Sequence, residues 1–280
     1  MSLMLKLLST LLLLSSLSFA SDTVQKVEDF LDEQLNENSR ISNVEVNVVD
    51  VVDVPKAKNF KAYIVSVKAT VQRSSDKKVK IDRRMILFSD GNVVTNELSS
   101  LDSGMRLVEY VKPNFKPQYY TKSNLIYGDV NAEHKIAFFS DPLCPFCRSF
   151  VPKAIKELKK HPKTFAIYYY HFPLDRIHPA SVDLVKAAVV AQEQGVKDVV
   201  LKLYDVRINP RETDTKKILA AFNKVMKTNI TPKDLQAKSL QEHIENDMDI
   251  ITKLMVNSTP TVYFDGKADR TKKKYKEFIK

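Results

Sequence analysis

The two cysteines of this 280-residue chain lie close together, at positions 144 and 147, in the segment FFSDPLCPFC. The apolar run HKIAFFS (residues 134–140) leads into the pair and predicts a buried strand. Beyond the pair, apolar residues recur at helical spacing, and a second apolar run, TFAIYYYHF (residues 164–172), follows. The order strand–helix–strand predicts two parallel strands joined by a right-handed crossover.

The position of Cys144, where a strand ends and a helix begins, predicts a reactive thiol. The free amide donors and the positive end of the helix dipole favour a thiolate there. First cysteines of Cys-X-X-Cys motifs have pKa values of roughly 3.5 to 7, against about 8.5 for a free cysteine. The thiolate is the form that attacks disulfides, and Cys147, one helical turn further on, is placed to resolve the mixed disulfide. Pro145 suits the first turn of a helix.

Two other interpretations of the cysteine pair stay open. A metal site needs two more ligands, which only His161, His171 or His178 could supply, since there is no second cysteine pair. A purely structural disulfide would close a loop of a few residues, where the entropic gain is least. We favour redox chemistry and expect no metal.

The rest of the C-terminal half contains a long stretch of helical rhythm, from Ala180 to about Leu254. The segment TPTVYFDGK (residues 259–267) then predicts a strand and a turn, and a short amphipathic helix closes the chain. A cis bond between Thr259 and Pro260 would expose peptide groups beside Cys144, where an extended substrate segment could pair with them.

Three segments together resemble the periplasmic Dsb thiol-disulfide oxidoreductases, most closely the DsbC/DsbG type. They are FSDPLCPFC, TPTVYF and HFPLDRIHPASVDLVKAAVVAQEQG. The resemblance implies a thioredoxin fold with a helical insertion at about 179–255. It implies Cys144 as nucleophile, Cys147 as resolving thiol, and Thr259 and Pro260 as a substrate-binding loop. Pro145 and Phe146, between the cysteines, would tune the redox pair. No cofactor is implied besides the redox-active disulfide Cys144–Cys147.

The N-terminal half predicts a separate α+β module. The segment SDTVQKVEDFLDEQL (residues 21–35) has a helical stripe of apolar residues. Three runs with alternating apolar residues follow, at 44–54, 60–71 and 77–88, and Asp90-Gly91 is a hairpin signal. Strands in sequence with short connections favour an antiparallel sheet with the helix on its apolar face. Because this half lacks histidine and cysteine, we interpret it as a dimerisation or interaction domain.

The first twenty residues have the features of a secretory signal peptide. Lys6 precedes the apolar run Leu7 to Leu14, and Ser18-Phe19-Ala20 forms a small-x-small cleavage site. An uncleaved N-terminal anchor is the alternative; either way the body of the protein is exported, and we expect it in the periplasm. The predicted domains are a signal peptide (1–20), an N-terminal domain (21–102), a linker (103–118) and a thioredoxin-like catalytic domain (119–280).

The net charge of +10 does not indicate a nucleic-acid-binding protein, because the lysines are scattered. We expect an enzyme that exchanges disulfides with folding exported proteins, acting as isomerase or reductase with an oxidase component. Its expected partners are unfolded or misoxidised exported proteins, a membrane redox partner of the Dsb type, and a second copy in a homodimer. The alternatives are a periplasmic chaperone (holdase) with secondary redox activity and a dedicated thiol reductase for cytochrome maturation.

Overall fold

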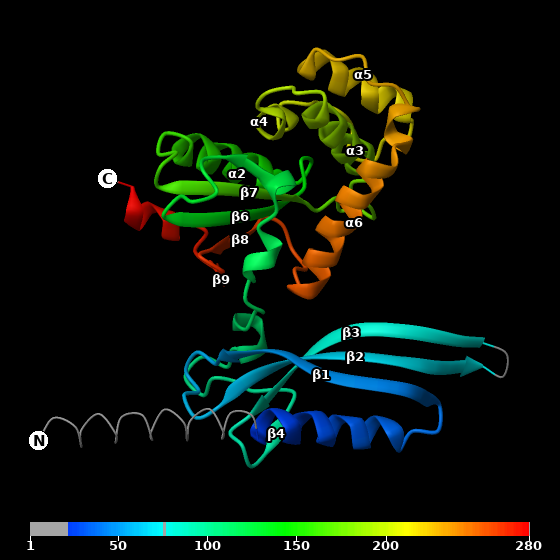
Figure 1. The fold of residues 1–280 in the computed structure, drawn as a ribbon, viewed down its shortest axis with the longest axis vertical. Helices are drawn as coiled ribbons and strands as arrows, with labels where there is room; N and C mark the ends of the chain where they lie inside the picture. The colour runs from blue at the N-terminus through cyan, green and yellow to red at the C-terminus, as the bar shows by residue number, and fades with distance from the viewer. Residues whose placement is uncertain (1–21, 75–76, 280) are drawn as a thin grey trace, which may run out of the picture. The chain divides into compact units, whose positions relative to one another are not determined.

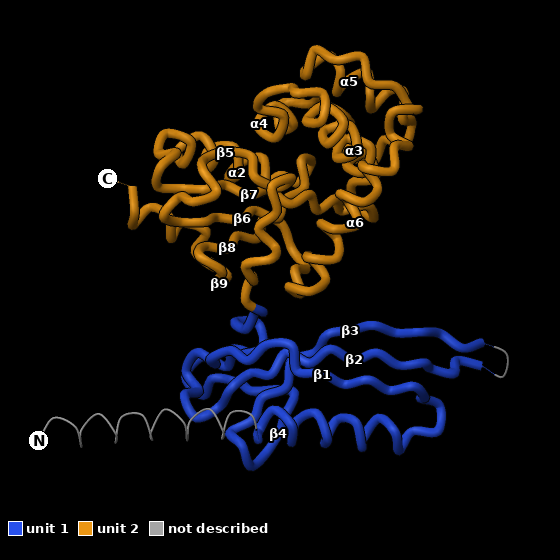
Figure 2. Tube along the Cα trace, in the orientation of Figure 1, with its two compact units in different colours: residues 1–113 blue, residues 114–280 orange. Residues whose placement is uncertain are grey.

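A computed structural model describes residues 22–74 and 77–279. The chain divides into two compact units between Pro113 and Asn114, and each is described by itself (Figure 2). The predicted signal peptide (1–20) lies outside the described residues. Within the described part of the chain, no helix has the length and hydropathy needed to cross a membrane.

The first unit is a helix packed on a four-stranded antiparallel sheet (Figure 1). Residues 22–36 form the helix, and the strands, in the order β1-β2-β3-β4, are β1 (Ile41–Asp53), β2 (Lys61–Ser74), β3 (Lys77–Ser89) and β4 (Val94–Thr95). The helix buries Val27 and Leu31 against one face of the sheet. Alternating apolar residues of β2 and β3 cover that face: Tyr63, Val65, Val67 and Leu87. This arrangement confirms the predicted α+β module.

The turn from β3 to β4 follows the predicted Asp-Gly signal. The Asp90 carboxylate accepts hydrogen bonds from the main-chain N–H groups of Asn92 (2.9 Å) and Val93 (3.1 Å). Gly91 has a φ of +98°, in the region that favours glycine. The chain then passes through a four-residue 3-10 helix, Leu107–Tyr110, within the predicted linker (103–118).

The second unit is built around a five-stranded mixed sheet in the order β5-β7-β6-β8-β9. Its strands are β5 (Leu125–Tyr127), β6 (His134–Ser140), β7 (Phe165–His171), β8 (Thr261–Phe264) and β9 (Lys267–Ala268). Strands β6 and β7 are parallel and are joined by helix α2 (Pro145–Leu158), as the sequence predicts. Strand β8 returns antiparallel to β6, which brings residues near 260 next to the end of β6.

Strand β7, which lies between β5 and β6, is buried on both faces, which explains its unbroken apolar sequence. Its alternate side chains enter two different clusters. On the face covered by α2 the cluster contains Phe165, Ile167 and Tyr169. On the opposite face it contains Ala166, Tyr168 and Tyr170, which pack with the end of α6 (Lys238–Lys253).

The helical stretch after β7 contains four α-helices: α3 (Ala180–Glu193), α4 (Val199–Leu203), α5 (Thr215–Met226) and α6. Left-handed residues separate them: Gly195 and Asp198 between α3 and α4, and Lys227 after α5. Helices α3, α4 and α5 gather beside the sheet (Figure 1) around an apolar core of their own.

Short 3-10 helices connect the elements of the second unit, at Pro117–Tyr119, Lys122–Asn124 and Asp234–Gln236. At its end, Lys274–Phe278 is also a 3-10 helix, where the sequence predicts a short amphipathic helix. Tyr275 anchors this segment: it is buried and its hydroxyl donates a hydrogen bond to Glu157 on α2 (2.8 Å).

Candidate active site

Cys144 is the N-cap residue of α2, between the end of β6 and the first helical residue, Pro145. Its backbone is extended (φ −64°, ψ 124°), and its carbonyl accepts the first helical hydrogen bond, from the N–H of Arg148 (3.0 Å). Both cysteines are free thiols; Cys144 is 5% exposed and Cys147 is fully buried. The thiol of Cys144 therefore lies where the sequence predicts, at the end of a helix that favours negative charge.

A buried carboxylate shapes the turn that precedes Cys144. Asp141 is completely buried, and its Oδ1 accepts hydrogen bonds from the main-chain N–H groups of Leu143 (2.6 Å) and Cys144 (3.0 Å). Its Oδ2 accepts a bond from the N–H of Leu174 (2.7 Å), and His178 Nδ1 lies 3.3 Å from its Oδ1. Asp141 thus fixes the turn to the loop after β7. The sequence did not reveal this role, although an aspartate just before a turn is a signal for side-chain capping.

The two residues between the cysteines differ in exposure. Pro145 occupies the first turn of α2, as predicted, where its missing N–H removes no hydrogen bond. Phe146 is 74% exposed, so its ring lies on the surface next to the active-site thiol. Arg148, in the first turns of α2, donates two hydrogen bonds to main-chain carbonyls: from Nε to Pro142 (2.8 Å) and from Nη2 to Val206 (2.7 Å).

The structure brings the distant Thr259-Pro260 segment against Cys144. The peptide bond between these residues is cis. The Cys144 thiol lies 3.8 Å from the carbonyl oxygen of Thr259, to which it donates a weak S–H hydrogen bond. The pairing of Thr261 in β8 with Phe139 in β6 holds the loop in this place.

Burial dominates the environment of Cys147. The pKa of this thiol is raised from 9.0 to about 12, mainly by burial and to a smaller extent by the nearby sulfur of Cys144. The hydroxyl groups of Ser140 and Thr259 and a main-chain N–H at Asp141 stabilise the thiolate and so oppose this rise in pKa. Cys147 is therefore protonated at neutral pH and can act as a nucleophile only after it loses its proton.

The Thioredoxin family model matches residues 120–280 of this sequence, more than half of the chain. The chain belongs to the thioredoxin family. This match, together with the sheet order and the position of α2, confirms the predicted thioredoxin fold of the second unit.

Two curated relatives illustrate the similarity. The Na(+)/H(+) antiporter NhaA 1 of Mycobacterium sp. (strain KMS) is 26% identical over 166 residues, which are 59% of this chain but only 26% of that protein. The probable disulfide bond formation protein D of Bacillus cereus is 29% identical over 160 residues, 53% of this chain and 72% of that protein. The chain thus spans about a quarter of the length of the antiporters that it matches.

Two solved structures, one from Bacillus subtilis and one from Proteus mirabilis, are similar to this chain. BdbD from Bacillus subtilis shares 20% identity with a TM-score of 0.45, covering 60% of this chain and 93% of that one. ScsC from Proteus mirabilis shares 18% identity with a TM-score of 0.44, covering 54% of this chain and 73% of that one.

Behind the cysteines, the thioredoxin unit contains a group of buried hydroxyls that the sequence did not reveal. Ser140 Oγ lies 2.6 Å from the hydroxyl of Tyr204, which lies 2.8 Å from the hydroxyl of Tyr169. The Tyr169 hydroxyl is 3.5 Å from the carbonyl oxygen of Ser140. Tyr204 follows α4, so its place next to the end of β6 depends on the tertiary fold.

A second buried carboxylate lies beside the end of β7. Asp247 of α6 accepts hydrogen bonds from the side chain of Asn124 (2.7 Å) and the main-chain N–H of His171 (2.8 Å). Burial raises the pKa of Asp247 to about 7, and burial lowers the pKa of His171 to about 3, with a smaller contribution from His243. Across residues 22–74 and 77–279, no three histidine, cysteine or acidic side chains are grouped to hold a metal ion.

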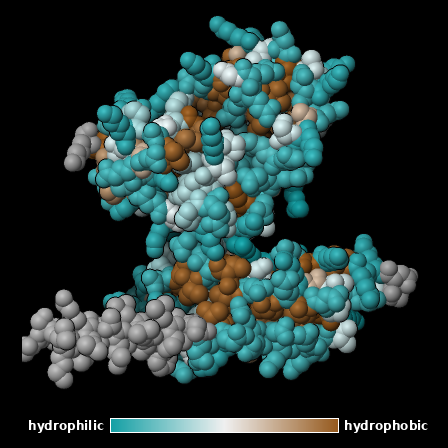
Figure 3. Space-filling view, viewed as in Figure 1, coloured by the Kyte–Doolittle hydropathy of each residue, from teal (hydrophilic) through white to brown (hydrophobic). Residues whose placement is uncertain are grey.

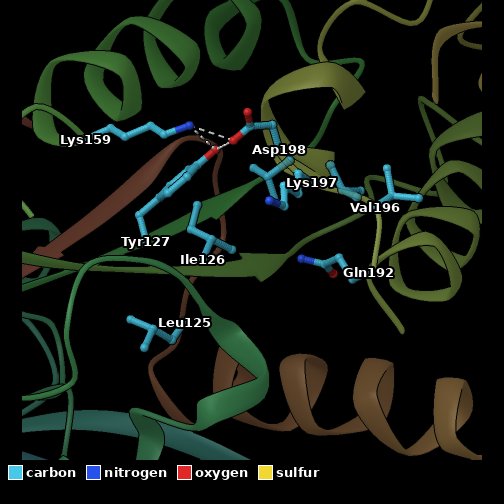
Figure 4. A pocket seen from close by; sticks show the side chains of 10 residues that line it. Leu125, Ile126, Tyr127, Lys159, Gln192, Val196, Lys197 and Asp198 are labelled. Carbon is cyan, nitrogen blue, oxygen red and sulfur yellow. Dashed lines mark hydrogen bonds and ion pairs between the residues drawn. The ribbon is translucent and has the colours of Figure 1, made fainter. Parts of the chain in front are cut away.

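At the other end of α2, a pocket of about 380 Å³ is lined by β5 and the segment between α3 and α4. Lys159, Tyr127 and Asp198 point toward one another there (Figure 4). Lys159 Nζ donates to the hydroxyl of Tyr127 (3.1 Å) and to Asp198 Oδ1 (2.7 Å). None of the predicted site residues lines this pocket.

Proposed function

We propose that this protein is an exported thiol-disulfide oxidoreductase that exchanges disulfides with folding exported proteins through Cys144 and Cys147. The observation that carries the proposal is the position of the Cys144 thiol. It lies at the start of α2 and 3.8 Å from the Thr259 carbonyl of the cis-proline loop, with Cys147 buried one turn behind. The name of the Bacillus cereus relative, a probable disulfide bond formation protein, supports the same class of reaction.

The proposed reaction proceeds by two thiol-disulfide exchanges. The Cys144 thiolate attacks a substrate disulfide; the substrate S–S bond breaks, and one substrate sulfur leaves as a thiolate that takes up a proton. Cys147 then loses its proton and attacks Cys144, which releases the second substrate thiol and forms the Cys144–Cys147 disulfide. The substrate is reduced and the enzyme oxidised by two electrons. The reverse sequence introduces a disulfide into a substrate dithiol.

Substrate binding is proposed to use the Thr259-Pro260 loop. Its main-chain groups lie beside the reacting thiol, so an extended substrate segment can pair with them while its sulfur meets Cys144. Phe146, 74% exposed, offers an apolar contact that suits unfolded rather than folded proteins. Unfolded or misoxidised exported proteins are thus the proposed substrates. A membrane redox partner of the Dsb type would reset the enzyme in the periplasm.

The direction of the reaction and the dimer are further parts of the proposal. We propose an isomerase or reductase of the DsbC/DsbG type, with an oxidase component, that works as a homodimer through its first unit. The first unit supports an interaction surface because Figure 3 shows apolar side chains gathered over its sheet. Five large apolar side chains among its described residues are exposed: Phe30, Val51, Val93, Leu101 and Met105.

The same apolar surface favours a second candidate, a periplasmic chaperone that holds unfolded chains. Blocking both thiols separates the two functions, because prevention of aggregation would survive the block and disulfide exchange would not. A dedicated reductase for cytochrome maturation would instead show one favoured partner and little activity on scrambled substrates.

The test of the proposed function is a trapping experiment. In Cys147→Ala the mixed disulfide at Cys144 cannot be resolved from within, so adducts with exported proteins should accumulate and disappear on reduction. Non-reducing electrophoresis and mass spectrometry identify them. Cys144→Ala is the matched control and should form none. The proposal is wrong if Cys147→Ala yields no adducts, or if Cys144→Ala retains thiol exchange.

A further inference from the structure

Three buried hydroxyl groups form a chain behind Cys147. The members are Ser140 at the end of β6, Tyr169 on β7 and Tyr204 after α4, and all three are at most 3% exposed. The successive oxygen–oxygen distances are 2.6 Å from Ser140 to Tyr204 and 2.8 Å from Tyr204 to Tyr169. Such distances belong to well-formed O–H···O hydrogen bonds.

The chain ends at the buried thiol. Cys147 packs in the same cluster as Tyr169 and Tyr204. The hydroxyl of Ser140 is one of the groups that stabilise the Cys147 thiolate and so oppose the rise of its pKa. The hydroxyl of Thr259 is another, and among the described residues it is buried without a hydrogen-bond partner while Cys147 is a thiol. Donors therefore surround a sulfur that is neutral at rest.

The donors of the chain can be arranged in two ways. In the first, Tyr169 donates to the carbonyl of Ser140, Tyr204 donates to Tyr169, and Ser140 donates to Tyr204. In the second, Tyr169 donates to Tyr204, Tyr204 donates to the hydroxyl oxygen of Ser140, and Ser140 is free to donate to Cys147. The distances allow both, because each hydroxyl contact can be donated from either side.

We propose that this chain switches to the second arrangement whenever Cys147 carries negative charge, so that Ser140 donates a hydrogen bond to its sulfur. Ser140 is the donor at the reacting atom, and Tyr204 and Tyr169 are positioning residues that act through it. The inference rests on the proposed function, since it gives the charge on Cys147 a place in the reaction.

The charge arises in each direction of exchange. When an external thiolate attacks Cys144 of the disulfide, the Cys144–Cys147 bond breaks and its electron pair passes to Cys147, which leaves as a thiolate and then takes up a proton from water. In the reverse direction Cys147 gives its proton to water before it attacks Cys144. Burial raises the pKa values of Tyr169 and Tyr204, so both hydroxyls stay protonated. The chain therefore supplies hydrogen bonds and holds no charge itself.

The experiment measures reduction of the oxidised protein by dithiothreitol, in which Cys147 is the leaving group. The protein is sampled by acid quenching, alkylation and mass spectrometry. Ser140→Ala should lower the second-order rate constant about tenfold, because a hydrogen bond to a charged group is lost. Tyr204→Phe and Tyr169→Phe should lower it by smaller factors, with Tyr204 the larger of the two. Tyr168→Phe is the matched control: the buried Tyr168 hydroxyl has no hydrogen-bond partner in the part of the chain that the structure describes, and it faces the other side of β7.

A second measurement separates this role from a structural one. In the mixed disulfide of Cys144 with glutathione, attack by Cys147 accelerates as pH rises, and Ser140→Ala should move that pH profile to higher pH. Loss of packing alone would lower stability without moving the profile. Rates and profiles for Ser140→Ala and Tyr204→Phe equal to those of Tyr168→Phe would overturn the inference. If Ser140→Ala does not fold, the rate and pH profile of Tyr204→Phe alone test the inference.

The two proposals fail in different ways. Dithiothreitol and glutathione need no protein substrate, so absent adducts in the trapping experiment, with the Ser140 effect intact, would refute only the proposed function. Trapped adducts, together with a Ser140→Ala variant whose rate and pH profile match those of Tyr168→Phe, would refute only the proposed role of the hydroxyl chain.

Discussion

Asp247 and His171 are neighbours whose buried environment favours the neutral form of both. The main-chain N–H of His171 donates to the Asp247 carboxylate, and neither side chain has more than 1% exposure. The pKa of Asp247 is raised from 3.8 to about 7 and that of His171 is lowered from 6.5 to about 3. Because its pKa is raised, Asp247 makes its full contribution to the stability of the fold below pH 3.8, and this contribution is lost as pH rises through 7. Because its pKa is lowered, His171 contributes to the stability of the fold above pH 6.5, and this contribution is lost as pH falls toward 3.

Asp247→Asn should reduce the loss of stability that accompanies rising pH. The amide cannot ionise, so between pH 5 and 8 the free energy of unfolding should fall less than in the wild type, by roughly 1 to 3 kcal/mol. Denaturant unfolding at both pH values measures it. Asp249→Asn, an exposed position on the same helix, is the control and should keep the wild-type dependence. An unchanged pH dependence in Asp247→Asn would contradict the raised pKa.

At the scale of elements, the three-residue strand β5 and the turn after it are held in place by their contacts with β7. β5 is too short to give an alternating pattern, and the sequence did not predict it. It pairs with β7, and Gly128 directly after it has a φ of +81°. A β-carbon at this position would lie 2.0 Å from the carbonyl oxygen of Phe165. The chain can therefore approach β7 here only with glycine.

Gly128→Ala should destabilise the thioredoxin unit by roughly 2 to 4 kcal/mol, since both the backbone conformation and the contact with Phe165 are lost. Gly195→Ala is the matched control. Its φ of +79° is equally unfavourable for alanine, but apart from its two chain neighbours no described residue has an atom within 4 Å of an added β-carbon, so about 1 kcal/mol is expected. Thermal or denaturant unfolding compares the two variants. Equal losses of stability in the two variants would show that the close approach to Phe165 adds nothing to the destabilisation by Gly128→Ala.

At the scale of the whole molecule, the proposed dimer depends on the first unit. Strand β1 is at one end of its sheet, next to β2, and Val51 in that strand is 39% exposed. Strands at the end of a sheet that expose apolar side chains commonly meet another chain. The first unit has no cysteine, so disrupting such a contact should leave the chemistry of Cys144 intact.

Val51→Lys should shift the protein from dimer to monomer in light scattering coupled to gel filtration. Refolding of a scrambled substrate should become less efficient, while reduction of the oxidised protein by dithiothreitol keeps its rate. Val130→Lys, a more exposed valine (51%) in the thioredoxin unit, should leave the dimer unchanged. A monomeric wild type, or a Val51→Lys protein that remains dimeric, argues against this surface.

The sequence by itself predicted the features that depend on neighbouring residues. Periodicity predicted the parallel β6–β7 pair and the helix-and-sheet first unit, and the motif placed Cys144 at a helix start. The sequence also indicated Thr259 and Pro260 as site residues, because a Thr-Pro step directly before a predicted strand can be recognised in the sequence. The predicted strands and the helix start are confirmed because local hydrogen bonding and alternation of apolar residues determine them, whereas the substrate-binding role of Thr259 and Pro260 stays a prediction.

Tertiary structure decided what surrounds the thiols. Asp141 could be read as a turn residue, but its bond to Leu174 requires the return of the chain after β7. Tyr204 meets Ser140 only because α4 packs beside the sheet, and burial, which raises the pKa of Cys147, is a property of the assembled core. Spacing along the chain shows which groups can react. Desolvation and contacts between distant segments determine how readily each one gives up its proton, and only the folded chain creates them.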